Sequence, residues 1–132
     1  MKRSKLILGT VQFGLDYGIN NKKGKPNFTD VKKILDYAYI NGITILDTAE
    51  AYGNSQEVIG KYHSQSKNKF KIITKYGELR KDLPVNLVER VNLNLQLLNV
   101  DFLHCYMFHN FNSFELLFES FKSQLIELKK KG

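Results

Sequence analysis

Three ionisable residues directly follow short apolar segments of the chain: Asp47, Lys75 and His109. A fourth residue, Tyr52, lies in the predicted loop that begins at Asp47. If the apolar segments are parallel strands of an α/β fold, their C-terminal ends meet at the edge of the sheet where ligands bind. A lysine paired with an aspartate can lower the pKa of a nearby tyrosine, which then gives a proton to a carbonyl oxygen. The four residues together therefore predict a proton-transfer site.

Each of these residues has an ordinary structural explanation when it is taken alone. An aspartate after a strand is typical of a turn or cap, and a lysine at the same place is usually solvated. A single histidine is more often structural than catalytic, and Tyr52 is one of seven tyrosines. The functional interpretation depends on the joint placement at three of the four predicted strand ends.

The apolar segments have the length and composition of buried strands. They predict strands at residues 6–10, 43–46, 70–74 and 102–108. The stretch between the first two strands predicts a loop over residues 11–27, because several breakers interrupt it. These breakers are Gly14, Gly18, Gly24 and Pro26.

Amphipathic segments follow the strands and predict helices. Thr29 can cap the first helix, and Gly42 stands where its C-terminus favours a positive φ. A short helix is expected over residues 55–62, and the next runs from after Pro84 to about Leu98. The apolar face of the first helix comprises Val31, Ile34, Leu35 and Ala38. The helix after Pro84 presents Leu87, Val88, Val91, Leu95 and Leu98. The last helix presents Phe114, Leu117, Phe118, Phe121, Leu125 and Leu128.

The strict alternation of strands and helices predicts an α/β fold with four parallel β-α units. Because crossovers of this kind are right-handed, the four strands are expected to lie in chain order in one sheet. Two architectures fit this pattern. One is a small open α/β sheet, and the other is half of a (β/α)8 barrel, which typically needs about 250 residues.

The composition is that of a globular domain. The 132 residues are 42% hydrophobic and 25% charged, which excludes a disordered or fibrous chain. No segment approaches the roughly 18 apolar residues of a membrane helix, and the apolar start is too short for a signal peptide. The single cysteine, Cys105, excludes an internal disulfide framework and a cysteine zinc site. We therefore expect a cytoplasmic protein with no metal and no membrane partner.

The net charge of +7 raises the question of an anionic partner. The lysines are scattered along the chain, however, and no predicted helix carries a basic stripe interleaved with aromatic residues. A solvated lysine-rich surface is favoured over a nucleic-acid interface.

Four segments, taken jointly and in order, carry a resemblance to a known family. They are residues 8–14 (LGTVQFG), 46–60 (LDTAEAYGNSQEVIG), 73–75 (ITK) and 100–109 (VDFLHCYMFH). These segments resemble the first strand, the Asp–Tyr signature, the lysine strand and the histidine strand of the aldo/keto reductase family. The resemblance covers the whole chain, and it implies that the chain is a single half-barrel domain over residues 1–132, the N-terminal half of a (β/α)8 TIM barrel.

The resemblance also implies an activity, the NADP-dependent reduction of an aldehyde or ketone. Tyr52 would be the general acid, and Lys75 and Asp47 would form the buried pair that tunes it. His109 would orient the carbonyl group of a small-molecule substrate. The nicotinamide ribose of NADP would lie near three residues: Gly9, Thr10 and Asp47.

The family barrel has eight strands and this chain supplies four. We therefore expect either self-association through the open sheet or a C-terminal half that is missing from the sequence. The resemblance implies that this other half carries the Ser-Asn pair, the stacking aromatic and the basic pocket that complete the cofactor site. Two alternatives to an active reductase stay open: a catalytically silent half-barrel and a non-enzymatic α/β binding module.

Overall fold

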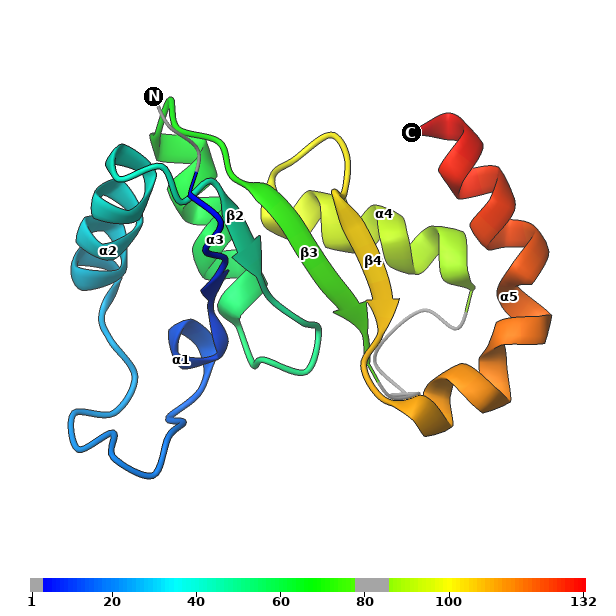
Figure 1. Ribbon diagram of the computed structural model, residues 1–132, viewed down its shortest axis with the longest axis horizontal. Coiled ribbons are helices and arrows are strands. Elements are labelled where there is room, and N and C mark those ends of the chain that lie inside the picture. The colour runs from blue at the N-terminus through cyan, green and yellow to red at the C-terminus, as the bar shows by residue number, and fades with distance from the viewer. Residues whose placement is uncertain (1–3, 78–85) are drawn as a thin grey trace.

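The four strands form one parallel sheet in chain order. The computed structural model describes residues 4–77 and 86–132. The strands are β1 (Leu8–Gly9), β2 (Ile45–Asp47), β3 (Lys71–Tyr76) and β4 (Cys105–Phe108) (Figure 1). The helices are α1 (Val11–Gly14), α2 (Phe28–Ile40), α3 (Ser55–Gln65), α4 (Leu87–Leu98) and α5 (Phe111–Lys131). The parallel sheet in chain order is the one that the sequence predicts.

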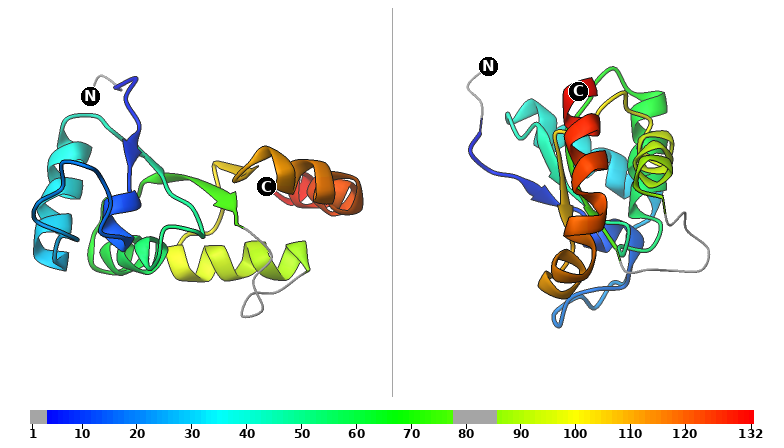
Figure 2. Two further views of the ribbon diagram at one scale, coloured as in Figure 1. Left: turned by 90° about the horizontal axis from the view of Figure 1, so that it is seen from below. Right: turned by 90° about the vertical axis from the view of Figure 1, so that its right-hand side faces the viewer.

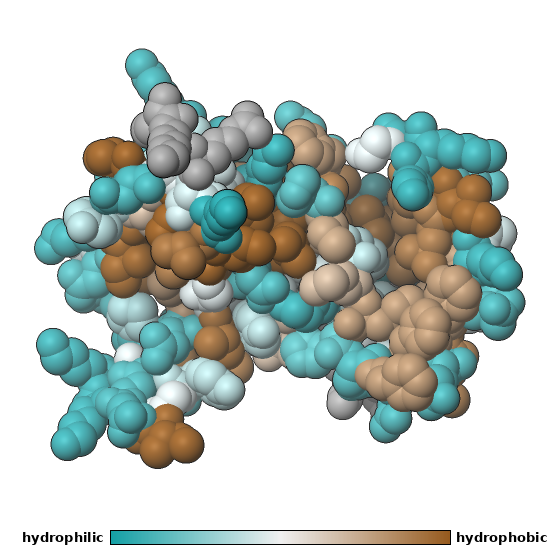
Figure 3. Space-filling view, viewed as in Figure 1, coloured by the Kyte–Doolittle hydropathy of each residue, from teal (hydrophilic) through white to brown (hydrophobic). Residues whose placement is uncertain are grey.

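The sheet has one covered face and one open face. Figure 2 shows α3 and α4 on the same side of the sheet, while α2 lies towards its β1–β2 side and α5 beside β4. In β3, Ile72, Thr74 and Tyr76 are buried on the covered side, whereas the residues between them, Ile73 and Lys75, are only half-buried. Apolar side chains gather over the sheet in the view of Figure 3.

An apolar core lies between α2, α3 and the sheet. We call the following nine buried residues the apolar core: Phe13, Val31, Leu35, Leu46, Ile59, Tyr62, Phe70, Ile72 and Leu98. The prediction for the first helix is confirmed at three positions, where Val31, Leu35 and Ala38 are at most 5% exposed. It is wrong at Ile34, which is 41% exposed, because α2 lies at one end of the sheet and packs through a narrow stripe.

The boundaries of several elements differ from the predicted ones. The strand predicted at residues 6–10 is reduced to Leu8–Gly9, and the start of the segment predicted as a loop over 11–27 is the short helix α1. The cap of α2 is Asn27, whose Oδ1 accepts from the Asp30 backbone N–H, and not Thr29, which lies inside the helix. Gly42 has the expected positive φ of 83°.

The later elements also shift. The second strand begins at Ile45, not at 43, and the third extends to Tyr76, so Lys75 lies inside β3, where it pairs with Met107. The fourth strand is Cys105–Phe108, shorter than the predicted 102–108, and α3 runs on to Gln65. Pro84, which was expected to precede a helix, lies outside the described residues.

The buried face of α4 is only partly apolar. Leu87 and Leu98 are buried as predicted, but Arg90 and Asn94 are buried on the same helix. The predicted apolar residues Val88, Val91 and Leu95 are half-buried. On α5, Phe121 packs with Tyr76 and Leu87, while Phe114 is 39% exposed. Tyr76, Leu87 and Phe121 form a second, smaller apolar cluster. On α4 the buried polar residues Arg90 and Asn94 lie between Leu87 of this cluster and Leu98 of the apolar core.

Candidate active site

Asp47 and Lys75 form an ion pair at the C-terminal edge of the sheet. Asp47 is the last residue of β2 and pairs in register with Ile73, so its side chain and that of Lys75 share the open face. Lys75 Nζ donates to Asp47 Oδ1 at 2.5 Å and to the Thr48 carbonyl at 3.0 Å. The side chains are 14% exposed for Lys75 and 32% for Asp47. This partly buried pair fixes the position of the lysine cation.

Tyr52 and His109 lie next to this pair. Lys75 Nζ is 5.2 Å from the centroid of the Tyr52 ring. The rings of Tyr52 and His109 are 6.0 Å apart, edge to face at 85°. The His109 backbone N–H donates to the Tyr76 carbonyl at 3.0 Å, which continues the pairing of β3 with β4 past the strand end. The structure therefore brings together all four residues that the sequence nominates.

Close backbone packing holds the turn that carries Tyr52. A Cβ at Gly14 would lie 1.7 Å from the Tyr52 carbonyl oxygen, so only glycine fits where α1 meets this turn. Gly53 has a φ of 55°, in the left-handed region that favours glycine. The Ser55 N–H donates to the Tyr52 carbonyl at 3.0 Å and leads the chain into α3.

Buried hydroxyl groups join β1 to the end of β2. Thr10 Oγ1 donates to the Asp47 carbonyl at 3.0 Å, and Ser55 Oγ donates to the Thr10 carbonyl at 2.9 Å. Thr10 and Ser55 are fully buried, so the hydroxyl of Thr10 fixes the backbone of Asp47. Gly9 differs, because no atom lies within 4 Å of the place a Cβ would take. The contacts of Gly9, Thr10 and Asp47 with a cofactor stay a prediction.

A second polar group lies behind the sheet, and the sequence patterns did not predict it. Glu50 Oε2 accepts from the Gly77 backbone N–H and from Arg90 Nε, both at 2.8 Å. Its Oε1 accepts from Asn94 Nδ2 at 2.7 Å and from the Tyr106 hydroxyl at 2.8 Å. We call these residues, with the Gly77 N–H, the Glu50 cluster. Its ion pair is deeply buried, with the side chains of Arg90 1% and Glu50 6% exposed.

Neighbouring side chains complete the hydrogen bonding of this cluster. Gln56 Nε2 donates to Thr74 Oγ1 at 2.9 Å and to the Asn94 side-chain oxygen. Burial, together with the adjacent Glu50 carboxylate, raises the pKa of the Tyr106 phenol far above its ordinary value. Tyr106 therefore stays protonated and donates to Glu50. One sequence signal was available: Arg90 and Asn94 stand four residues apart, on one face of a predicted helix.

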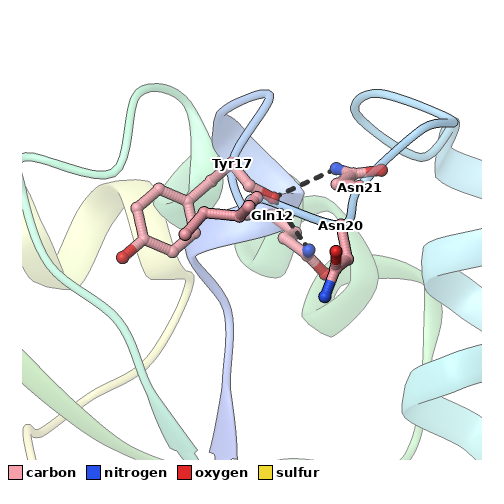
Figure 4. Close-up of a pocket in the computed structure, with 6 residues that line it drawn as sticks. Gln12, Tyr17, Asn20 and Asn21 are labelled. Carbon is pink, nitrogen blue, oxygen red and sulfur yellow. Dashed lines mark hydrogen bonds between the residues drawn. The ribbon is translucent and has the colours of Figure 1, made fainter.

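The loop after α1 forms a pocket. Its volume is about 590 Å³, and it is lined by Gln12 and residues 17–21. Figure 4 shows the side chains of Gln12 and Asn21 turned towards the Tyr17 carbonyl, to which they donate at 2.8 and 3.1 Å. Lys25 hydrogen-bonds Asn54, two residues after Tyr52. These bonds order the loop next to the candidate site.

Two negative findings apply to residues 4–77 and 86–132. Within these ranges, no group of three or more His, Cys, Asp or Glu side chains could hold a metal ion. None of the helices in this part of the chain is both long and apolar enough to cross a membrane.

Comparisons with known proteins agree on one family. The sequence model of the aldo/keto reductase family matches residues 5–132. A crystal structure of a candidate aldo-keto reductase from Pseudomonas aeruginosa shares 29% identity with a TM-score of 0.79, over 98% of this chain and 52% of that one. No curated protein matches.

More distant structures share the fold. An aldo/keto reductase from Brucella melitensis has 21% identity and a TM-score of 0.63, over 96% of this chain and 44% of that one. The glycerol dehydrogenase of Gluconobacter oxydans has 24% identity and a TM-score of 0.57, over 80% and 35%. The chain thus spans about half the length of these barrels, or less, and its four β-α units correspond to half of a (β/α)8 barrel, not to a small open sheet.

Proposed function

Because this chain belongs to the aldo/keto reductase family, we propose that it carries the catalytic residues of an NADP-dependent reductase acting on an aldehyde or ketone. The observation that supports this proposal is the Asp47–Lys75 ion pair beside Tyr52 and His109 on the open face. A phenol, a cation and an imidazole converge there at the edge of the sheet where α/β enzymes bind substrates.

Tyr52 is the proposed general acid. Its hydroxyl gives a proton to the carbonyl oxygen of the substrate as the alcohol forms. The Lys75 cation, 5.2 Å from the ring centroid, stabilises the negative charge that develops on the phenol oxygen as this proton leaves. Asp47 holds the ammonium group in place through its 2.5 Å hydrogen bond.

His109 is the proposed substrate-orienting residue. Its ring stands edge to face with Tyr52 at 6.0 Å, and the residue is exposed on the open side. An imidazole N–H at this place can donate a hydrogen bond to the same carbonyl oxygen that Tyr52 protonates. The two donors would then fix the carbonyl and polarise it.

The residues present fit the nicotinamide end of NADP. The open space over Gly9 admits a flat ring close to the backbone, and the Asp47 carboxylate, 32% exposed, can accept a hydrogen bond from a ribose hydroxyl. Thr10 would support this contact through its bond to the Asp47 carbonyl. When bound, this cofactor supplies the hydride. A cytoplasmic location is proposed with it, since the lone Cys105 has no second cysteine for an internal disulfide.

A complementary set of strands is proposed to cover the open face, from a second copy of the chain or from a C-terminal half. Among the described residues, β1 pairs only with β2 and β4 only with β3, so each has a free edge. Near these edges Leu6, Ile7 and Met107 are 66%, 49% and 39% exposed. Light scattering of the purified chain separates the sources: a dimer supports the second copy, and a monomer supports the C-terminal half.

The test is a titration of the purified 132-residue chain with NADPH, read by nicotinamide fluorescence. Micromolar affinity supports a working site, and activity with aldehydes is then measured. No binding at millimolar NADPH means that this chain by itself is a silent half-barrel. In the assembly that binds, Tyr52→Phe is expected to lower the reduction rate about 100- to 10,000-fold without changing NADPH affinity. Tyr37→Phe, at a tyrosine 74% exposed on α2, is the matched control. A Tyr52→Phe variant with the rate of the unmodified protein would refute the role.

A further inference from the structure

The Glu50 carboxylate joins three elements of the fold. Its two oxygens accept hydrogen bonds from the backbone after β3 (Gly77), from α4 (Arg90 and Asn94) and from β4 (Tyr106). The carboxylate itself belongs to the turn between Asp47 and Tyr52. All three partner elements are therefore fixed relative to the turn that carries the proposed acid.

These bonds lie directly beside the proposed catalytic residues. The Glu50 backbone N–H donates to the Lys75 carbonyl at 3.3 Å, and its carboxylate accepts from Gly77, two residues further along. Glu50 thus bonds the end of β3 at two places, at Lys75 itself and two residues after it. Tyr106 lies three residues before His109, whose N–H is bonded to the Tyr76 carbonyl. Glu50 consequently contacts the strand that carries Lys75 and the strand that leads into His109, but it lies behind the sheet and away from the open face.

We propose that Glu50 is a positioning residue, whose carboxylate holds the ends of β3 and β4 so that Lys75 and His109 meet Tyr52. This inference rests on the proposed reductase function for its catalytic consequence. It assigns no contact with substrate or cofactor to Glu50.

Energetics favour positioning over stability as the role of this group. A buried ion pair gains Coulomb energy but loses the hydration of both ions, and apolar residues of similar volume are often as stable or more stable. Directed hydrogen bonds from several elements to one carboxylate differ from an apolar contact, since they fix distances and angles among those elements. A shift of about 1 Å at a reacting group can cost about 100-fold in rate.

The primary test compares two single-hydroxyl deletions on neighbouring strands. Tyr106→Phe removes one bond to Glu50 and leaves the ion pair intact. Tyr76→Phe is the matched control, because the buried Tyr76 hydroxyl has no hydrogen-bond partner among the described residues. We expect Tyr106→Phe to lower kcat about tenfold with unchanged NADPH affinity, and Tyr76→Phe to leave kcat unchanged. Equal kcat values in the two variants would overturn the proposal.

Glu50→Gln tests the same role more strongly. It keeps the shape of the side chain but replaces one acceptor oxygen with an NH₂ group facing donors. We expect kcat to fall on the order of 100-fold, with a smaller change in KM. If this variant does not fold, the comparison of Tyr106→Phe with Tyr76→Phe still decides.

A spectroscopic readout separates failure of this inference from failure of the proposed function. The ring centroids of Tyr52 and His109 are 6.0 Å apart. Cross-relaxation between the protons of the two rings reports how close the rings lie, and it requires no turnover. We expect the signal to weaken in Tyr106→Phe and to persist in Tyr76→Phe. If the unmodified protein reduces no carbonyl compound but the two variants differ in this way, the reductase function fails and the positioning by Glu50 stands. If the signal is the same in both variants, the positioning role fails.

Discussion

The two halves of the covered side of the sheet are built by opposite means. Under β1, β2 and the start of β3, the apolar core packs aliphatic and aromatic side chains from α1, α2 and α3. Under the C-terminal ends of β3 and β4, the Glu50 cluster packs a buried ion pair and the Asn94 amide of α4, which the Gln56 amide of α3 contacts. The first half depends on burial of apolar area, which is tolerant of small displacements. The second depends on directed bonds, which are not.

The half built from directed polar bonds is the one that lies closer to the proposed catalytic residues. The polar half lies directly behind Lys75 and Tyr52, where a proton donor has to be held in one orientation. The apolar half lies where α2 and α3 need only be kept against the sheet. The comparison predicts that polar substitutions near Glu50 affect stability and rate together, whereas substitutions in the apolar core affect stability.

Removal of the Arg90 cation is expected to destabilise the polar half more than any other change considered. Arg90→Ala leaves the Glu50 carboxylate buried without its ion-pair partner, and we expect a loss of about 3–5 kcal/mol in the free energy of unfolding. Urea unfolding followed by circular dichroism measures this loss. Lys33→Ala is the control, because the Lys33–Asp30 pair is exposed at 75% and 52%, and should change stability by less than about 0.5 kcal/mol. A loss below 1 kcal/mol for Arg90→Ala would mean that Glu50 is not desolvated.

The apolar half is tested by truncation of one leucine. Leu35 is fully buried in the apolar core, and Leu35→Ala is expected to cost about 2–5 kcal/mol through lost burial and the cavity left behind. The adjacent Ile34, 41% exposed, is the matched control, and Ile34→Ala should cost less than about 1 kcal/mol. The same unfolding assay applies. Similar losses at both positions would show that α2 buries a wider face than the structure describes.

The apolar half and the open-face residues were predictable from sequence, and the reasons are local. Periodic apolar residues such as Val31 and Leu35 record which side of a helix is buried. Asp47 and His109 are recognisable because each ends or follows a strand, and parallel strands in chain order bring such ends together. The positions of strand ends were less predictable, since Lys75 lies inside β3 through pairing with β4.

The Glu50 cluster was not predictable in the same way. Arg90 and Asn94 are polar residues on a helix whose predicted buried face is apolar, and such residues are ordinarily solvated. Their burial depends on Glu50, forty residues or more away in sequence, and on Tyr106 in another strand. No local pattern encodes a contact among three distant segments. Only the tertiary structure places the four side chains together.

His63 is a polar side chain at the edge of the apolar core. Its protonation tests how the apolar half responds to a charge, and this effect on stability changes gradually with pH. It is 1% exposed, its Nδ1 lies 2.8 Å from the Leu98 carbonyl, and its Nε2 accepts from the Phe70 N–H at 3.2 Å. These partners require the neutral ring, with the proton on Nδ1. Burial lowers the pKa of His63 from its ordinary 6.5, although the hydrogen bond to Leu98 acts in the opposite direction.

The sign of the resulting pH dependence follows from this shift. Below about pH 6.5 the unfolded chain binds a proton at His63 that the folded chain does not bind. The free energy of unfolding therefore decreases as the pH is lowered, until the folded pKa is reached. The slope is at most about 1.4 kcal/mol for each pH unit. Asp36 does not contribute to this slope. Hydrogen bonds from Lys32 and Tyr62 lower the pKa of its carboxyl from the ordinary 3.8, so the stability that it adds is lost only as the pH falls below about 4.

Urea unfolding between pH 5 and pH 8 measures this dependence. We expect His63→Gln to be less stable than the unmodified chain at pH 8 and to lose most of the slope between pH 7 and pH 5. The control is His104→Gln, at an exposed histidine, which should keep that slope. A slope that survives in His63→Gln and disappears in His104→Gln would contradict a neutral His63 in the fold. The apolar core would then admit a charged ring as readily as the Glu50 cluster admits a carboxylate, and the two halves of the covered side would not differ in this respect.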